Sequence, residues 1–187
     1  MGRWEPNARG RLEEAALDLY GERGYEKTTV AEIAARAGLT ERTFFRHYAD
    51  KREVLFAGSS LLQDVLTKAV ADAPDGASPL DATAAALDAV SAIFAGRRAH
   101  ARRRQAVINA NTELRERELI KLATLASTLA DALRRRGVPD PTAPLTAETG
   151  IAVFKVAFDR WLTTPTDQEL AEILRESLAT LKTVTAA

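Results

Sequence analysis

The chain contains no cysteine among its 187 residues, which excludes disulfides, thiolate nucleophiles and cysteine-ligated zinc or iron–sulfur sites. It has only two histidines, His47 and His100, and neither belongs to a cluster with metal-ligand spacing. It also lacks an apolar run approaching the ~20 residues that cross a bilayer, and its first residues contain no apolar signal-peptide core. We therefore expect a cytoplasmic protein without a metal, a cofactor or a membrane partner.

Net charge is absent as well, because 26 Lys and Arg balance 26 Asp and Glu. DNA-binding domains are commonly basic, so the overall charge does not by itself indicate a nucleic-acid partner. The charge is unevenly placed, however, since residues 40–52 contain four Lys or Arg and one His against two carboxylates. A local positive face of this kind can bind phosphates even in a neutral chain.

Strand signals are absent and apolar residues recur at helical spacing, so the predicted fold class is all-α. Capping residues and Gly or Pro breaks predict where the helices begin and end. We expect a helix from an Asn7 cap to Gly24, a short helix from a Thr29–Glu32 capping box to Gly38, a helix from a Thr40 cap to Tyr48, a long helix from an Asp50–Glu53 capping box to Ala69, and helices over Leu80–Phe94, Arg97–Ala110, Glu113–Arg136, Thr146–Leu162 and Asp167–Thr183, the last capped by Asp167.

Residues 29–48 hold the most informative pattern, which is two short helices joined by a tight turn at Gly38-Leu39-Thr40. In the second helix, Phe44 and Tyr48 are one turn apart and are expected to pack inward. This is the layout of a helix-turn-helix, whose second helix enters the major groove of DNA. The residues left for its outer face are Arg42, Thr43, Arg46 and His47.

The chemistry of these side chains suggests how they would contact DNA. Arg can bond bidentately to guanine, while Thr offers a hydroxyl to a base or phosphate and a methyl group to thymine. Thr29 lies at a helix N-terminus, whose free amides suit a phosphate, and Lys51 adds a charge at the start of the next helix. Phe45 is expected to be partly buried or to lie at the edge of the DNA. The candidate DNA-binding residues are Thr29, Thr40, Arg42, Thr43, Phe45, Arg46, His47 and Lys51.

Simpler interpretations of these residues exist. Arg42 and Arg46 could form only a solvated face, and Arg46 could point away from the DNA. His47 could be a solvated or a core histidine, although its place in the motif favours a phosphate or base contact.

Residues 8–55 resemble the DNA-binding domain of the TetR (tetracycline repressor-like) family of bacterial transcriptional regulators. The resemblance rests on Gly24-Tyr25, on Thr28-Thr29-Val30 followed by Glu32-Ile33-Ala34, on Ala37-Gly38-Leu39-Thr40, on Thr43-Phe44-Phe45 followed by His47-Tyr48, and on Lys51 with Val54-Leu55. It implies a helix-turn-helix domain of three helices over residues 1–50, a larger helical ligand-binding and dimerisation domain over residues 51–187, and repression relieved by a small molecule. The sequence departs from the family at Phe45, where a tyrosine is frequent. Glu41 would repel phosphate but could accept from cytosine.

The segment Arg97–Arg104 carries five arginines in eight residues. They could form a solvated helix face, with their stems covering apolar surface, or an anion site for a ligand or for DNA. Residues 102–118 look like the C-terminal domain of some acyl-CoA-responsive members of the family, which implies an apolar ligand tunnel. The alternative is ordinary core. The candidate pocket residues are Leu87, Val90, Phe94, Arg98, Arg102, Val107, Ile108, Leu122, Leu125 and Phe154.

The last two expected helices each carry a broad apolar face. In the family the final two helices of each subunit form an intersubunit four-helix bundle, and a two-fold dimer suits DNA half-sites about one helical turn apart. The alternative is a core within one chain. The dimer-interface residues that the resemblance implies are Phe158, Trp161, Leu162, Leu170, Ile173, Leu174 and Leu178.

We therefore predict a homodimeric transcriptional regulator that represses neighbouring genes. Its partners would be a palindromic double-stranded operator, a second copy of the chain and a small-molecule effector, acyl-CoA-like or otherwise apolar. An enzyme would need His100 as a general base beside the arginines, but no nucleophile or orienting carboxylate stands at a recognisable spacing. A helical anion- or lipid-binding module without operator function would not need the intact Thr29, Thr43, His47 and Lys51.

Overall fold

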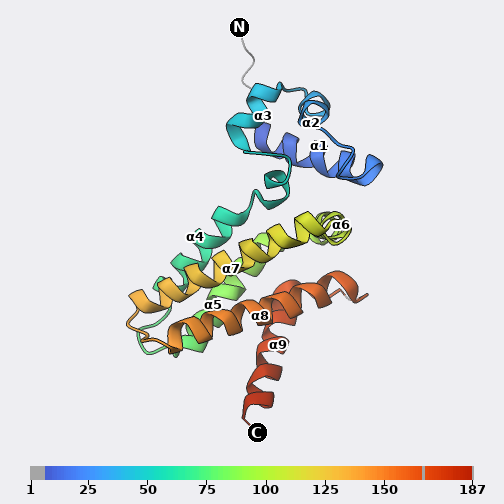
Figure 1. The fold of residues 1–187 in the computed structure, drawn as a ribbon. Coiled ribbons are helices and arrows are strands. Elements are labelled where there is room, and N and C mark those ends of the chain that lie inside the picture. Colours follow the sequence, from blue (N-terminus) through green and yellow to red (C-terminus); the bar gives the residue numbers. More distant parts are fainter. Residues whose placement is uncertain (1–6, 166, 187) are drawn as a thin grey trace. The chain divides into compact units, whose positions relative to one another are not determined.

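The computed structural model describes residues 7–165 and 167–186, which form helices joined by short connections (Figure 1). No strand occurs among these residues, so the predicted all-α class is confirmed. The elements are α1 (Ala8–Arg23), α2 (Val30–Arg36), α3 (Glu41–His47), the 3-10 turn η1 (Glu53–Phe56), α4 (Ser59–Asp72), α5 (Pro79–Ser91), the 3-10 turn η2 (Ala92–Phe94), α6 (Arg98–Asn109), α7 (Thr112–Arg135), α8 (Thr142–Thr163) and α9 (Leu170–Thr185).

The chain forms two compact units. The first unit contains the described residues up to Ala57 together with Arg102–Glu118, and the second contains Gly58–Ala101 and the chain from Leu119 onward. α6 and α7 are therefore each divided between the two units. The first unit differs from the predicted domain of residues 1–50, because it reaches Ala57 and takes in a segment from the middle of the chain. The functional division at residue 50 stays a prediction.

The first unit is built on α1, α2, α3 and residues 102–118. α1 begins after Asn7, whose side chain accepts a hydrogen bond from Gly10 N at 3.0 Å. The side chains with 0% exposure in this core include Leu12, Phe44, Ile108 and Leu114. Because Ile108 and Leu114 come from α6 and α7, the mid-chain segment completes the core of the helix-turn-helix.

Several predicted helix starts are wrong. Asp50 accepts hydrogen bonds from Arg52 N at 2.8 Å and Glu53 N at 3.2 Å, as a cap would, but the chain then forms only η1. α4 begins afterwards, at Ser59. α8 begins earlier than predicted, at Thr142. α9 begins at Leu170, where Glu169 N donates to Glu172 Oε2 at 3.2 Å, so Asp167 is not the cap.

α5 occupies the centre of the second unit, where it packs against α4, α8 and α9. It starts after Ser78, whose hydroxyl accepts from Asp81 N at 3.1 Å, with Pro79 in the first helical position. α5 and α8 approach closely at Gly150, because a Cβ there would stand 2.5 Å from Thr83 Cγ2. Only glycine permits this contact without a shift of one helix.

The residues predicted at the dimer interface point into the core of the second unit. Trp161, Leu170, Ile173 and Leu174 are 1% exposed, and Leu162 and Leu178 are also buried. Phe158 is half-buried against the same core. The broad apolar faces of α8 and α9 are thus covered within one chain, and the interface at these residues stays a prediction. The large apolar side chains that these two helices leave exposed are Leu145, Val156 and Val184.

The predicted ligand-pocket residues do not share one core. Val107 and Ile108 pack in the core of the first unit, to which Arg102 also belongs. The predicted set is therefore divided between the two units. The members that pack in the core of the second unit are Leu87, Val90, Phe94, Leu122, Leu125 and Phe154.

One described segment, Glu53–Asp72, is long and apolar enough by composition to be considered as a membrane span, with a mean hydropathy of 1.2. The structure divides it between η1 and α4, with the turn residues Ala57 and Gly58 between them. The 14 residues of α4 make a helix about 21 Å long, which is shorter than the ~30 Å hydrocarbon core of a bilayer. The segment is weak support for a membrane span.

Candidate nucleic-acid interface

The turn between α2 and α3 is set by main-chain hydrogen bonds. Gly38 N donates to Ala35 O at 3.0 Å, and Leu39 N donates to Ala34 O at 2.8 Å. Gly38 has a φ of +66°, a left-handed conformation that other residues rarely adopt. The turn therefore ends α2 and fixes the direction in which α3 begins.

The buried side of α3 fixes the rotation of this helix about its axis. Thr40 caps α3, with its Oγ1 accepting from Thr43 N at 3.2 Å. Phe44 is fully buried, and the buried Tyr48 donates its hydroxyl to Glu13 Oε1 at 2.8 Å. Burial, and then the Glu13 carboxylate, raise the pKa of Tyr48, so this hydroxyl remains a neutral donor at physiological pH. The predicted inward packing of Phe44 and Tyr48 is confirmed.

The opposite side of α3 is exposed and positively charged. Arg42 and Arg46 are exposed and one helical turn apart, and Thr43 is half-buried beside them. Within the described residues, neither arginine forms an ion pair or a hydrogen bond to another side chain. Two unneutralised guanidinium groups on one helix face suit phosphates or guanine edges.

The two rings at the end of α3 are also accessible. Phe45 is 56% exposed and packs edge-on against Phe44, with the ring centroids 5.5 Å apart. An exposed phenyl ring offers apolar contact, for example with a thymine methyl group. His47 is exposed, which removes the alternative of a core histidine.

Thr29, at the start of α2, is engaged within the protein. Its main-chain N and its hydroxyl both donate to Glu32 Oε2 at 2.9 Å, which completes the predicted capping box. These two hydrogen bonds hold the pKa of the Glu32 carboxyl below its ordinary value. The carboxylate also pairs with Arg23 at 2.7 Å. A phosphate at Thr29 would therefore meet a helix end that already holds a negative charge.

Lys51, which is predicted to add a charge near the start of the next helix, is bonded within the protein. Its ammonium group donates to Tyr25 O at 2.9 Å, Glu26 O at 3.3 Å and Thr28 O at 3.0 Å. It also lies over the Tyr25 ring, 4.3 Å from the centroid. Since three carbonyls take up the three ammonium protons, Lys51 ties down the α1–α2 connection and does not present a free cation.

Other arginines of the first unit are neutralised by carboxylates. Arg36 forms a bidentate pair with Glu22, with contacts of 3.0 and 2.8 Å. Arg52 pairs with Asp50 at 2.5 Å and with Glu113 at 2.8 Å. Arg42 and Arg46 of α3 therefore keep their positive charge exposed, although the chain as a whole is neutral.

The sequence did not predict the contacts that residues 102–118 make with the helix-turn-helix. Arg103 pairs with Glu14 at 3.0 Å and with Asp18. Arg104 Nε donates to Leu55 O at 2.6 Å. Burial lowers the pKa of Arg104, and the nearby Glu118 opposes this effect. The partners lie far apart in the sequence, so no local signal could have found them.

The arginine cluster at residues 97–104 is consequently not one anion site. Arg103 and Arg104 hold the first unit together, as described above. Arg98 belongs to the second unit, where it donates to Thr164 O and its guanidinium lies 5.9 Å from the Trp161 ring centroid. These contacts support a structural role for three of the five arginines.

Residues 12–57 match the family model described as bacterial regulatory proteins of the tetR family, and residues 77–186 match the model of the MftR C-terminal domain. The chain is 40% identical over 82 residues to the transcriptional regulator TcmR of Streptomyces glaucescens, a match that covers 44% of this chain and only 36% of TcmR. It is 27% identical over 165 residues to MftR of Mycobacterium tuberculosis, assigned to mycofactocin biosynthesis, with 87% and 83% of the two chains covered. The crystal structure of Thermus thermophilus FadR in complex with lauroyl-CoA superposes with a TM-score of 0.57 at 24% identity, covering 93% of each chain, which shows a shared fold.

Proposed function

The chain belongs to the tetR family of bacterial regulatory proteins, since the matched domains together span most of its length, and we propose that it is a homodimeric, ligand-responsive repressor of neighbouring genes. Its relatives are transcriptional regulators, and DNA binding is the activity that the helix-turn-helix supports. We also propose that the protein acts in the cytoplasm, where it would meet both the DNA and the effector.

The observation that carries the proposal is which side of α3 is buried and which is exposed. Phe44 and Tyr48 are buried on one side, so Arg42, Arg46 and His47 are left on the other. We propose that Arg42 and Thr43 read base edges in the major groove, and that Arg46 and His47 contact phosphates or bases. Thr40 and Phe45 lie at the margins of this face. Thr29 stays a candidate phosphate contact because it lies at the N-terminus of α2. Lys51 would support the interface indirectly, by holding the α1–α2 connection.

A second copy of the chain would supply the second recognition helix that a palindromic operator requires. We propose that the copies meet through the exposed sides of α8 and α9 in place of the buried residues first predicted. On α8, Val156 is 58% exposed and lies one turn from the small, exposed Ala152. On α9, Val184 is 67% exposed and follows the exposed Ala179 and Thr180. Small and apolar side chains on two neighbouring helices permit close packing against a symmetry mate.

The effector would bind in the second unit, whose packed core contains the predicted pocket residues Leu87, Val90 and Phe154 among others. The apolar side chains there would suit an apolar ligand, acyl-CoA-like or similar. The lauroyl-CoA complex of FadR supports this class through a shared fold only. Such a ligand would release the operator by binding one of two conformations more tightly than the other.

The proposal is tested by fluorescence anisotropy with duplexes taken from the DNA that flanks the protein's own gene. Binding should be sequence-selective, and the affinity should fall steeply with salt because counterions are released from the phosphates. Arg42→Ala should relax base preference at one position by about 1–3 kcal/mol. Arg134→Ala, on the second unit and paired with Asp140, serves as the matched control and should leave binding unchanged.

The alternative is a helical anion- or lipid-binding module without operator function. It predicts no selective duplex at moderate salt, and an Arg42→Ala variant that behaves like the Arg134→Ala control. Either result would overturn the regulator proposal.

A further inference from the structure

The two ends of α3 are held in different ways. This helix has seven residues, and the Thr40 cap and the turn before it fix its N-terminal end. Near the other end, Phe45, Arg46 and His47 are exposed. The next residue, Tyr48, is buried, so its side chain holds the C-terminal end of α3 against the rest of the first unit.

The Tyr48 side chain connects this end of α3 to α1. Its hydroxyl donates to Glu13 Oε1 at 2.8 Å. Its ring centroid lies 5.5 Å from that of Phe44 and 6.4 Å from that of His47. A hydrogen bond to a carboxylate is roughly twice as strong as one between neutral groups, and it also fixes direction. The Glu13 carboxylate therefore sets where the end of α3 that carries His47 lies relative to α1.

Glu13 is itself held in place by Arg9. Arg9 Nε lies 3.4 Å from Glu13 Oε1, and the two residues are one helical turn apart on α1. The same guanidinium donates to Ala57 O and lies 5.8 Å from the centroid of the Tyr48 ring. A partly exposed ion pair of this kind adds little stability by itself. Its effect is to give the acceptor of the Tyr48 hydroxyl a defined position.

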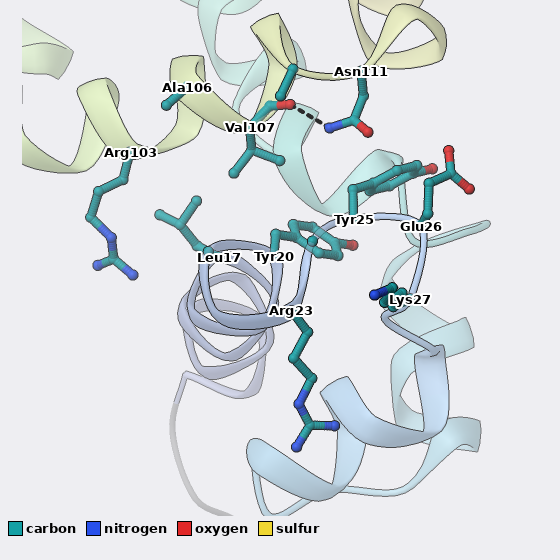
Figure 2. A pocket seen from close by; sticks show the side chains of 13 residues that line it. Leu17, Tyr20, Arg23, Tyr25, Glu26, Lys27, Arg103, Ala106, Val107 and Asn111 are labelled. Atoms are coloured by element: carbon teal, nitrogen blue, oxygen red, sulfur yellow. Dashed lines mark hydrogen bonds between the residues drawn. The ribbon is translucent and has the colours of Figure 1, made fainter.

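α1 is a suitable frame for this contact, because the mid-chain segment of the first unit packs along it. Figure 2 shows the buried Leu17 of α1 and Val107 of α6 on the two sides of one pocket. Arg103 of α6 pairs with Glu14, the residue next to Glu13, at 3.0 Å. Since α6 holds α1 in this way, loss of the contact with Tyr48 should displace α3 and leave α1 in place.

We propose that Glu13 is a positioning residue for DNA binding, which acts through Tyr48 to hold the end of α3 where Arg46 and His47 reach the DNA. This inference rests on the proposed function, and it assigns no DNA contact to Glu13 itself. If Glu13 acted only as a negative charge, its repulsion of phosphates would weaken binding, and its removal would raise the affinity. The positioning role predicts the opposite sign, which is a loss of affinity when the acceptor is removed.

The test compares full-length variants by fluorescence anisotropy with the duplex that the parent protein selects. Glu13→Leu leaves the Tyr48 hydroxyl without its acceptor and should weaken binding about tenfold. Glu13→Gln removes the same charge but keeps an acceptor oxygen, so its affinity should stay within about threefold of that of the parent protein. Glu26→Leu removes an exposed carboxylate from the α1–α2 connection and, as the charge control, should not weaken binding. Equal affinities of Glu13→Leu and Glu13→Gln would overturn the proposal.

A double variant tests whether Glu13 acts through Tyr48. Tyr48→Phe removes the donor and should weaken binding about as much as Glu13→Leu does. Glu13→Leu/Tyr48→Phe replaces both polar partners by apolar side chains that can pack together, so it should bind at least as tightly as either single variant. Circular dichroism establishes that each variant is folded. A double variant that binds more weakly than both single variants would show that the two residues act independently, and would refute the inference.

A measurement without DNA separates this inference from the proposed function. Tyr48 N donates to Phe44 O at 2.9 Å at the end of α3, and Phe44 N donates to Thr40 O at 3.0 Å nearer its start. In hydrogen exchange of the 15N-labelled protein, Glu13→Leu should speed exchange at the Tyr48 amide at least about fivefold and change that at Phe44 less than about twofold. Equal changes at the two amides would indicate a general loss of stability and contradict the positioning role. If the parent protein selected no duplex, the proposed function would fail, and the exchange rates would still decide whether Glu13 holds α3.

Discussion

Replacing Lys51 by methionine separates a structural role from a DNA contact. The ammonium group of Lys51 donates to three main-chain carbonyls between 2.9 and 3.3 Å, and two of these belong to the buried residues Tyr25 and Thr28. Methionine keeps an apolar stem against the Tyr25 ring but leaves the three carbonyls without this donor. Hydrogen bonds to charged groups contribute about 1.5–3 kcal/mol each, and the group is partly hydrated, so we expect a total loss of about 2–4 kcal/mol.

The loss is measured by urea unfolding and by the melting temperature. For a chain of this size 1 kcal/mol shifts Tm by about 2–4 °C, so Lys51→Met should lower Tm by about 4–16 °C. Lys27→Met is the matched control, since Lys27 is an exposed lysine near the same connection and should change stability by less than about 0.5 kcal/mol. Equal stabilities of the two variants would refute the structural role.

The DNA side of this prediction has its own measurement. A phosphate contact contributes about one unit to the slope of affinity against salt concentration. Because the Lys51 ammonium is already occupied, folded Lys51→Met protein should keep the slope of the parent protein. If the slope were smaller by about one and the stability were normal, Lys51 would contact a phosphate, which would contradict the hydrogen bonds that occupy its ammonium group.

Three further predictions follow from particular contacts. Gly150→Ala places a Cβ 2.5 Å from Thr83 Cγ2 and should destabilise the protein by about 1–3 kcal/mol in urea unfolding. Gly21→Ala, where a Cβ meets nothing within 4 Å, should stabilise the protein by up to about 1 kcal/mol, and equal effects of the two changes would contradict the packing described for Gly150. Hydrogen bonds from Thr29 keep the pKa of Glu32 in the folded protein below 4.5, so their contribution to stability is complete above pH 4.5 and is lost as the pH falls through the lower folded pKa. Glu32→Gln should therefore flatten the decline of the urea unfolding midpoint on acidification, and an unchanged decline would show that the Glu32 carboxyl does not cause it. Val156→Lys on the exposed side of α8 should dissociate the proposed dimer in sedimentation experiments, while Ala71→Lys on α4 should not, and a dimer intact in both would move the interface elsewhere.

The dimer prediction shows where amphipathic patterns stop being informative. The apolar faces of α8 and α9 were expected to meet a partner subunit, with a core within one chain as the alternative, because the pattern does not say which surface covers them. In the structure, Trp161, Leu170 and Ile173 meet the core of their own chain. The residues left for a partner, such as Ala152 and Val156, form a weaker pattern that the sequence did not distinguish.

The helix-turn-helix was predictable because its determinants are local. Thr29 and Glu32, Thr40 and Thr43, and the left-handed Gly38 act over a few residues, and each of these contacts occurs in the structure as expected. The spacing of Phe44 and Tyr48 likewise fixed which side of α3 faces the solvent.

The sequence by itself determined that this chain is helical, that it carries a helix-turn-helix and which residues α3 exposes. Only the tertiary structure decided that Lys51 is tied to the α1–α2 connection and that residues 102–118 belong to the DNA-binding unit. The physical reason is the distance along the sequence between the residues that make each contact. Caps, turns and helix faces depend on neighbours within about four residues, whereas the pairing of Arg103 with Glu14, or of Ile108 with the core around Phe44, brings together residues with no local relation.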